Sequence, residues 1–88
     1  MPQPTKIRVY STSTCPFCKM EKAWLEKNQV AFDFVLVDQD KQAAKHMIDA
    51  TGQMGVPVTE LIYENAQPTY VIGFDRAALA EHLGLANA

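Results

Sequence analysis

Cys15-Pro16-Phe17-Cys18 separates an extended apolar segment from a helical pattern and contains both cysteines of the chain. A proline at the first helical position costs no hydrogen bond, because the N–H at that position has no partner within the helix. Pro16 also disfavours helical backbone angles at the residue before it. The tetrapeptide therefore predicts that a helix begins at Pro16 with Cys15 as its N-cap.

The N-cap position favours the thiolate form of Cys15. A capping side chain accepts hydrogen bonds from N–H groups of the first turn, here those of Phe17 and Cys18, and the helix dipole adds partial positive charge. Cys18 lies one turn later, where Cβ atoms are about 5–6 Å apart and small adjustments allow a disulfide. A structural disulfide is the alternative, but closing so short a loop removes little entropy from the unfolded chain. We expect Cys15 to be a nucleophile and the pair to be redox-active.

The composition is that of one small globular domain. The chain has 88 residues, of which 48% are hydrophobic and 20% are charged, enough for a single modest core. A net charge of −2 without a basic cluster argues against a nucleic-acid partner. Residues 1–5 read as a loose tail, and no stretch resembles a signal peptide or a membrane span. We therefore expect a cytoplasmic protein, in which a close cysteine pair is more often catalytic or metal-binding than a permanent cross-link.

The order of predicted elements indicates an α/β fold. Alternating and β-branched segments predict strands over residues 6–11, 30–37, 57–62 and 69–72, the last two forming an antiparallel hairpin. Helical patterns cover residues 16–28, the segment from the cap candidates Asp38 to Asp40 up to Gly52, and a last segment that opens at Asp75. A strand, helix, strand order implies a parallel pair joined by a right-handed crossover. The pattern thus predicts a mixed sheet with helices packed on it.

Three motifs in this order resemble the glutaredoxin family and the related redoxins that reduce ribonucleotide reductase. Glutaredoxin active sites read Cys-Pro-Tyr/Phe-Cys after a first strand. Gly55-Val56-Pro57 is similar to the family's Thr-Val-Pro, and Ile72-Gly73-Phe74-Asp75 is similar to its Gly-Gly-aromatic-Asp. The resemblance covers nearly the whole chain. It implies a single thioredoxin-like domain over residues 1–88, with a four-stranded mixed sheet flanked by three helices and an active site built from three loops.

The resemblance also implies where substrates bind. The family's cis proline lies beside the cysteines, which would leave the backbone of Val56 free to pair with an extended substrate. The turn at Gly73 resembles a glutathione-binding turn, in which a helix N-terminus and an acidic side chain hold the γ-glutamyl end of the tripeptide. Helix N-termini bind carboxylates, although Asp75 also reads as a simple N-cap. The candidate substrate- or glutathione-binding residues are Phe17, Gln53, Val56, Pro57, Gly73, Phe74 and Asp75.

Three positions differ from the usual glutaredoxin pattern. Thr12 stands where a lysine is frequent, Ile72 replaces a first glycine, and Arg76 replaces a second acidic residue. These differences predict that glutathione is a poor or optional co-substrate, so that either glutathione or a thioredoxin-reductase-type flavoprotein recycles the disulfide.

We therefore expect a monomeric dithiol oxidoreductase that reduces protein or low-molecular-weight disulfides, with Cys15 as the nucleophile and Cys18 as the resolving cysteine. No tightly bound cofactor is expected. His46 and His82 are distant from the cysteines in sequence, so the chain offers a poor zinc set. The alternative is an adaptor that carries an iron–sulfur cluster or senses redox state through the same cysteines without turnover.

Overall fold

The structure, a computed structural model, describes residues 3–85, so residues 1–2 of the predicted tail lie outside the described part. At the inner end of that tail, the N–H of Thr5 donates to the carbonyl oxygen of Ile62 at 2.7 Å. Within the described residues, strands and helices alternate before a final hairpin and helix: β1 Lys6–Ser11, α1 Pro16–Lys27, β2 Asp33–Leu36, α2 Lys41–Thr51, β3 Val58–Ile62, β4 Thr69–Ile72 and α3 Arg76–Leu83.

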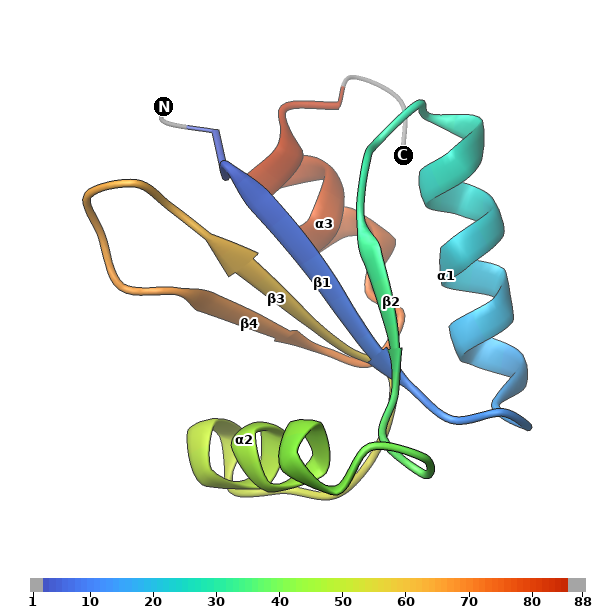
Figure 1. The fold of residues 1–88 in the computed structure, drawn as a ribbon. Coiled ribbons are helices and arrows are strands. Elements are labelled where there is room, and N and C mark those ends of the chain that lie inside the picture. The colour runs from blue at the N-terminus through green and yellow to red at the C-terminus, as the bar shows by residue number, and fades with distance from the viewer. Residues whose placement is uncertain (1–2, 86–88) are drawn as a thin grey trace.

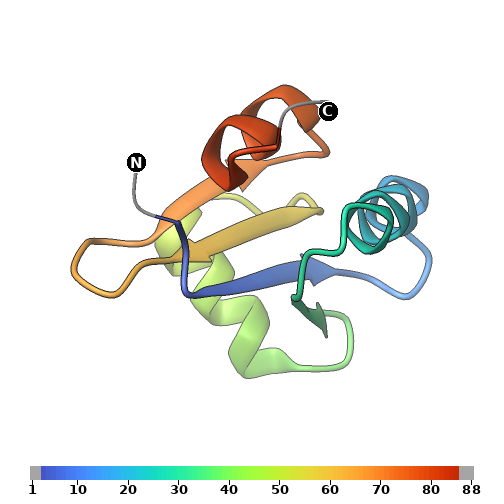
Figure 2. The same cartoon turned by 90° about the horizontal axis from the view of Figure 1, so that it is seen from above.

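The strands form one mixed sheet in the order β2-β1-β3-β4 (Figure 1). β1 is parallel to β2 with Val9 opposite Phe34 and antiparallel to β3 with Val9 opposite Thr59, and β3 is antiparallel to β4. The α2 helix lies on one face of the sheet, while α1 and α3 lie on the other (Figure 2). This arrangement confirms the predicted fold class, with its parallel pair, C-terminal hairpin and three helices.

Alternation along the strands divides the core between the two faces. Ile7, Leu61, Val71 and Leu79 form a buried cluster on the face covered by α1 and α3. Tyr10, Met47 and Val58 form the second cluster, between α2 and the sheet. Each face of the sheet is therefore packed, as is usual for a sheet that contains a parallel pair, here β2 and β1 at one edge.

The predicted strand over residues 30–37 is longer than the observed one, because its first residues terminate α1 instead. Asn28 is the C-cap, as predicted, and Gln29 then adopts a left-handed φ of 59°. The N–H of Gln29 donates to the Glu26 carbonyl and that of Val30 to the Leu25 carbonyl, both at 3.0 Å. These two bonds make a Schellman motif, whose usual glycine is absent here. Pairing with β1 starts only at Asp33.

The strand predicted to begin at Pro57 begins one residue later, at Val58. Proline has no N–H to give to a strand ladder. Its carbonyl oxygen instead accepts a hydrogen bond from the N–H of Gly73 at 2.8 Å.

Candidate active site

Cys15 caps α1 as the sequence predicts. Its backbone is extended, with φ −83° and ψ 111°, and its sulfur accepts a hydrogen bond from the N–H of Cys18 at 3.2 Å. Pro16 occupies the start of the helix. The Cys15 side chain is partly accessible, whereas Cys18 is fully buried, and both thiols are free. A helix N-terminus thus presents one sulfur to the surface and holds the other directly behind it.

Burial raises the pKa of the Cys18 thiol to about 11, and the neighbouring Cys15 sulfur acts in the same direction. The Ser11 hydroxyl and the Thr12 backbone act in the opposite direction, because their hydrogen bonds favour the thiolate, but burial is the larger effect. Thiolates are the nucleophilic form of cysteine. Cys18 therefore holds its proton firmly while the pair is reduced.

A second loop meets the cysteines at Val56. The Val56-Pro57 peptide bond is cis, as the resemblance implies. The Val56 carbonyl oxygen lies 4.0 Å from the Cys15 sulfur and accepts its weak hydrogen bond. Pro57 is itself bonded through its carbonyl to Gly73, which lies at the end of β4. The three separated loops of the predicted site are thus linked in the order Cys15, Val56-Pro57 and Gly73.

The remaining predicted binding residues have structural roles of their own. Gly73 adopts a left-handed φ of 78° at the turn into α3. The Phe74 ring packs edge-on against Trp24 with ring centroids 6.0 Å apart, which joins α3 to α1. Asp75 is the N-cap of α3 and accepts the N–H of Ala78 at 3.1 Å, as the simpler interpretation predicted.

Phe17 and Gln53 complete the predicted set. Phe17 follows Pro16 in the first turn of α1 and is 62% exposed, so its ring is accessible two residues from Cys15. Gln53 is half-buried in the loop before Val56, and its N–H donates to the Thr51 hydroxyl at 3.3 Å. Within residues 3–85, no hydrogen bond joins Gln53 or Asp75 to either cysteine.

Glu21 is a buried carboxyl that the sequence analysis missed. Its side chain is fully buried, and the Thr59 hydroxyl donates a hydrogen bond to its Oε2 atom. Its Oε1 atom has no hydrogen-bond partner among the described residues. Burial raises the pKa of Glu21 to about 7, and the bond from Thr59 opposes that shift only in part. The spacing of the sequence could have indicated this burial, because Cys18, Glu21 and Leu25 recur at helical intervals and lie on a single face of α1.

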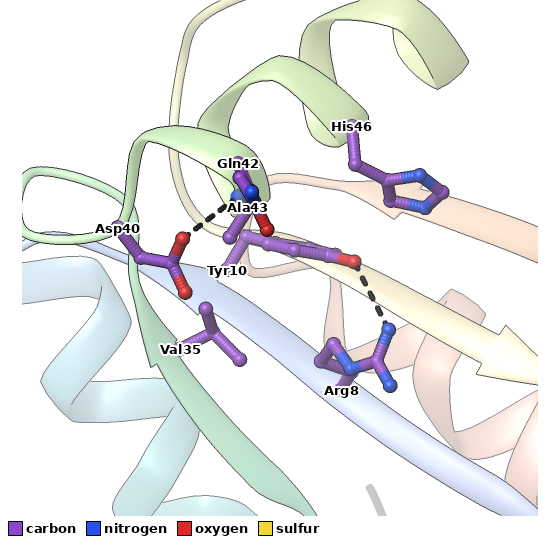
Figure 3. A pocket seen from close by; sticks show the side chains of 7 residues that line it. All are labelled: Arg8, Tyr10, Val35, Asp40, Gln42, Ala43 and His46. Atoms are coloured by element: carbon purple, nitrogen blue, oxygen red, sulfur yellow. Dashed lines mark hydrogen bonds between the residues drawn. The ribbon is translucent and has the colours of Figure 1, made fainter.

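A hollow of about 310 Å³ lies on the opposite face of the sheet, between α2 and β1 (Figure 3). Behind it lies the buried carboxyl of Glu60. Its Oε1 accepts hydrogen bonds from Arg8 Nη1 at 3.1 Å and Tyr10 Oη at 2.9 Å. Its Oε2 accepts one from Tyr70 Oη at 2.7 Å and lies 2.9 Å from His46 Nε2. Burial alone would raise the pKa of Glu60, but the bonds to His46, Tyr70 and Tyr10 outweigh it and hold that pKa below its ordinary value. The residues that line the hollow are Arg8, Tyr10, Val35, Asp40, Gln42, Ala43 and His46.

Within the part of the chain that the structure describes, no three histidine, cysteine or acidic side chains gather where a metal ion could bind. No helix among those residues is long and apolar enough to cross a membrane.

Comparisons with known proteins identify relatives of this chain. The glutaredoxin family model matches residues 7–61. A glutaredoxin-like 8.6 kDa protein of the rubredoxin operon of Clostridium pasteurianum is 34% identical over 73 residues, which are 83% of this chain and 91% of that protein. The glutaredoxin-like protein NrdH of Lactococcus lactis subsp. lactis is 35% identical over 43 residues, 49% of this chain and 60% of that protein.

Among solved structures, methanoredoxin of Methanosarcina acetivorans superposes with a TM-score of 0.80 at 30% identity, covering 94% of this chain and 88% of that one. This superposition agrees with the arrangement of the sheet and helices, and the family match and the C. pasteurianum relative show the family. The chain therefore belongs to the glutaredoxin family of thiol–disulfide oxidoreductases.

Proposed function

We propose that the protein reduces disulfides by a dithiol mechanism in which Cys15 attacks and Cys18 resolves. One observation carries this assignment: the Cys15 sulfur is partly accessible at the N-terminus of α1, whereas the Cys18 sulfur is buried behind it. A substrate can reach only the first sulfur without a rearrangement of the helix. The second sulfur is protected from external disulfides and yet adjacent to the first.

The chemistry follows from the order of access. The Cys15 thiolate attacks one sulfur of the substrate disulfide, forms a mixed disulfide and releases the other sulfur as a thiolate. Cys18 loses its proton and attacks the Cys15 sulfur, which releases the second substrate thiolate and forms the Cys15–Cys18 disulfide. Two electrons thereby pass from the cysteine pair to the substrate. A dithiol or two glutathione molecules must then return them.

The preferred substrate is a disulfide in an extended segment of another protein. The Val56 carbonyl lies beside the attacking sulfur, where backbone pairing with an extended peptide would be tolerant of sequence. Phe17, two residues from Cys15 in the chain, offers an accessible ring in the same helical turn, and aromatic rings supply much of the contact energy at interfaces. Low-molecular-weight disulfides would react with the Cys15 sulfur without making these contacts.

Glutathione would be a poor reductant for the resulting disulfide. Thr12 supplies no cation, and Ile72 and Arg76 alter the turn at Gly73 that would hold the tripeptide. Each lost charge-assisted hydrogen bond is worth about 1.5–3 kcal/mol, so two losses would weaken glutathione binding about a hundredfold or more. Turnover of a model disulfide should therefore be slow with glutathione and glutathione reductase, and faster with NADPH and a thioredoxin reductase. Efficient turnover with glutathione and none with thioredoxin reductase would overturn this assignment.

The mechanism is tested by replacing each cysteine in turn. Cys15→Ser should abolish reduction of every disulfide, because it removes the attacking sulfur. Cys18→Ser should still form a mixed disulfide with an oxidised protein substrate but should not release it, so that intact mass spectrometry detects the adduct. Full activity of Cys15→Ser, or free product from Cys18→Ser without any adduct, would refute the assigned roles.

A further inference from the structure

We propose that Glu21 takes the proton from Cys18 when Cys18 attacks the mixed disulfide. This inference rests on the proposed dithiol mechanism, and it adds a residue that neither the family's motifs nor the sequence analysis assigns. Glu21 acts through Cys18, not on the substrate. Geometry, an unpartnered atom and the surrounding charges each support it.

The geometry places the carboxyl one helical turn from the thiol, on the same buried face of α1. Cys18 and Glu21 are both fully buried, and residues three apart on a helix have Cβ atoms about 5–6 Å apart. Beneath them, Ser11 and Val9 lie on one face of β1, and Val9 is opposite Thr59, which binds the Glu21 carboxyl. One side-chain rotation or one bridging water spans such a separation, and catalytic hydrogen bonds are often long before substrate binds.

The unpartnered atom is Glu21 Oε1. Its partner oxygen, Oε2, is bonded to Thr59, while Oε1 has no hydrogen-bond partner among the described residues. Buried polar atoms in folded proteins are nearly always hydrogen-bonded. A buried carboxylate oxygen without a partner, one helical turn from a buried thiol, is available to accept the proton of that thiol.

The surroundings leave Glu21 free to change its charge. From β3, Thr59 is the polar group that faces it, and the neighbouring Glu60 points to the opposite face, toward Arg8 and His46. From β1 the facing side chains are the uncharged Val9 and Ser11. The buried residues of α3 are Leu79 and Ala80, while its Arg76 and Glu81 are exposed and His82 is half-buried. Cys18, with Cys15 beyond it, is the titratable neighbour on the face of α1 that Glu21 shares.

Proton and electron transfer balance in this step. The ionised Glu21 carboxylate accepts the Cys18 proton, and the Cys18 thiolate attacks the Cys15 sulfur of the mixed disulfide. The bond between Cys15 and the substrate sulfur breaks, and the substrate leaves as a thiolate. A carboxyl with a pKa of about 7 is ionised in half of the molecules near neutral pH, which suits both acceptance and return of a proton. When a reductant reopens the disulfide, Glu21 returns the proton to Cys18.

The experiment separates the two chemical steps within one reaction. An aromatic disulfide whose released thiolate absorbs visible light gives one burst when Cys15 attacks and a second when Cys18 resolves the mixed disulfide. Both phases are followed by stopped flow from about pH 5.5 to about pH 9.5, a range that brackets the titration of a carboxyl near pH 7. In the wild type, the second phase should accelerate through about pH 7 and level off above about pH 8, because the base is then almost fully ionised.

Glu21→Gln should leave the first phase unchanged and slow the second by about a hundredfold at neutral pH, the lower end of what general-base catalysis contributes. Its second phase should rise steadily with pH without levelling off, because hydroxide then takes the proton. Thr59→Val should move the inflection of the wild-type profile to higher pH, because it removes the hydrogen bond that favours the carboxylate. Glu26→Gln makes the same chemical change at an exposed position of α1 and should leave both phases as they are.

The outcomes distinguish this inference from the mechanism on which it rests. A second phase that persists in Cys18→Ser would refute the dithiol mechanism itself. If that control loses the second phase but Glu21→Gln keeps the wild-type rate and inflection, the mechanism stands and the role of Glu21 is refuted. An unchanged inflection in Thr59→Val would also contradict it, whatever the stability of the variants.

Discussion

Replacing the buried Glu21 with glutamine should change how the stability of the protein depends on pH. The folded state raises the pKa of this carboxyl from its ordinary 4.5 to about 7. Below about pH 4.5 the group is protonated in both the folded and the unfolded chain and contributes no pH dependence. Between the two values the unfolded chain releases a proton that the folded chain retains, so the free energy of unfolding falls as pH rises. Above about pH 7 this loss in the free energy of unfolding is complete, and it no longer changes with pH.

The magnitude follows from the size of that interval. From 4.5 to about 7, at about 1.4 kcal/mol per pH unit, the loss is about 3 kcal/mol. No allowance for solvent screening is needed, because the side chain is fully buried. Glutamine keeps the shape of the side chain but does not titrate. The wild type should therefore lose about 3 kcal/mol relative to Glu21→Gln between about pH 4 and about pH 8.

Urea denaturation of both proteins across this range measures the effect. The quantity of interest is the difference in the free energy of unfolding between the two chains at each pH, because titration of Glu60 and of the surface carboxyls cancels from it. The difference should shift steadily in favour of the glutamine variant from about pH 4.5 to about pH 7. A difference that stays constant across the range would show that Glu21 is ionised or solvated in the folded state, and would refute the reasoning.

Three further predictions follow from the burial and capping of single residues. Alkylation of the reduced protein should label Cys15 at neutral pH and leave Cys18 unlabelled in peptide maps, because Cys18 is buried and its pKa is raised to about 11; equal labelling would contradict this. Leu25→Ala should lower the free energy of unfolding by about 2–5 kcal/mol in urea titrations, because Leu25 is fully buried on the inner face of α1; a loss below about 1 kcal/mol would contradict its place in the core. Asp40→Ala should lower the free energy of unfolding by about 0.5–2 kcal/mol, because Asp40 is the N-cap of α2 and accepts the Ala43 N–H at 3.0 Å. A thermal unfolding midpoint that did not fall would contradict this.

The parts of the fold that could be predicted from sequence were those set by local chemistry. Pro16 and the capping thiol of Cys15 place the start of α1, and Asp40 and Asp75 place the starts of α2 and α3 in the same way. Each depends on one side chain and the N–H groups of the following turn, so no distant residue is needed. The cis bond before Pro57 depended on resemblance, because an X–Pro bond in a folded protein is usually trans.

The end of α1 shows where local reasoning failed. Val30 belongs to a β-branched and aromatic segment that predicts a strand, but its N–H closes the Schellman motif on Leu25. The left-handed position of that motif is usually a glycine, which would be visible in the sequence, but here Gln29 occupies it. Where the strand starts is decided by pairing between Asp33 and Arg8, a tertiary contact that no local signal reports.

Glu21 and Glu60 escaped prediction for a different reason, because an acidic residue in sequence is expected to be exposed. Their different surroundings follow from the alternation of β3, since the successive residues Thr59 and Glu60 point to opposite faces of the sheet. On the α2 face, Glu60 is surrounded by an arginine, a histidine and two tyrosine hydroxyls, which keep it ionised despite burial. On the α1 face, Thr59 is the one group among residues 3–85 that hydrogen-bonds the carboxyl of Glu21, and burial raises the pKa of that carboxyl.

The number of donors around each carboxyl therefore decides which of the two can exchange a proton near neutral pH. Glu60 has a lowered pKa, so it stays ionised near neutral pH and has little tendency to take up a proton. Glu21 has one hydroxyl donor and a pKa of about 7, so both of its forms are populated at the pH where disulfides exchange. It also shares its helix face with Cys18, whose thiol would lose a proton once in each cycle of the proposed dithiol mechanism. The face of the sheet beneath α1 thus combines the buried thiol with a carboxyl able to exchange its proton, while the face beneath α2 holds a carboxylate whose charge is fixed.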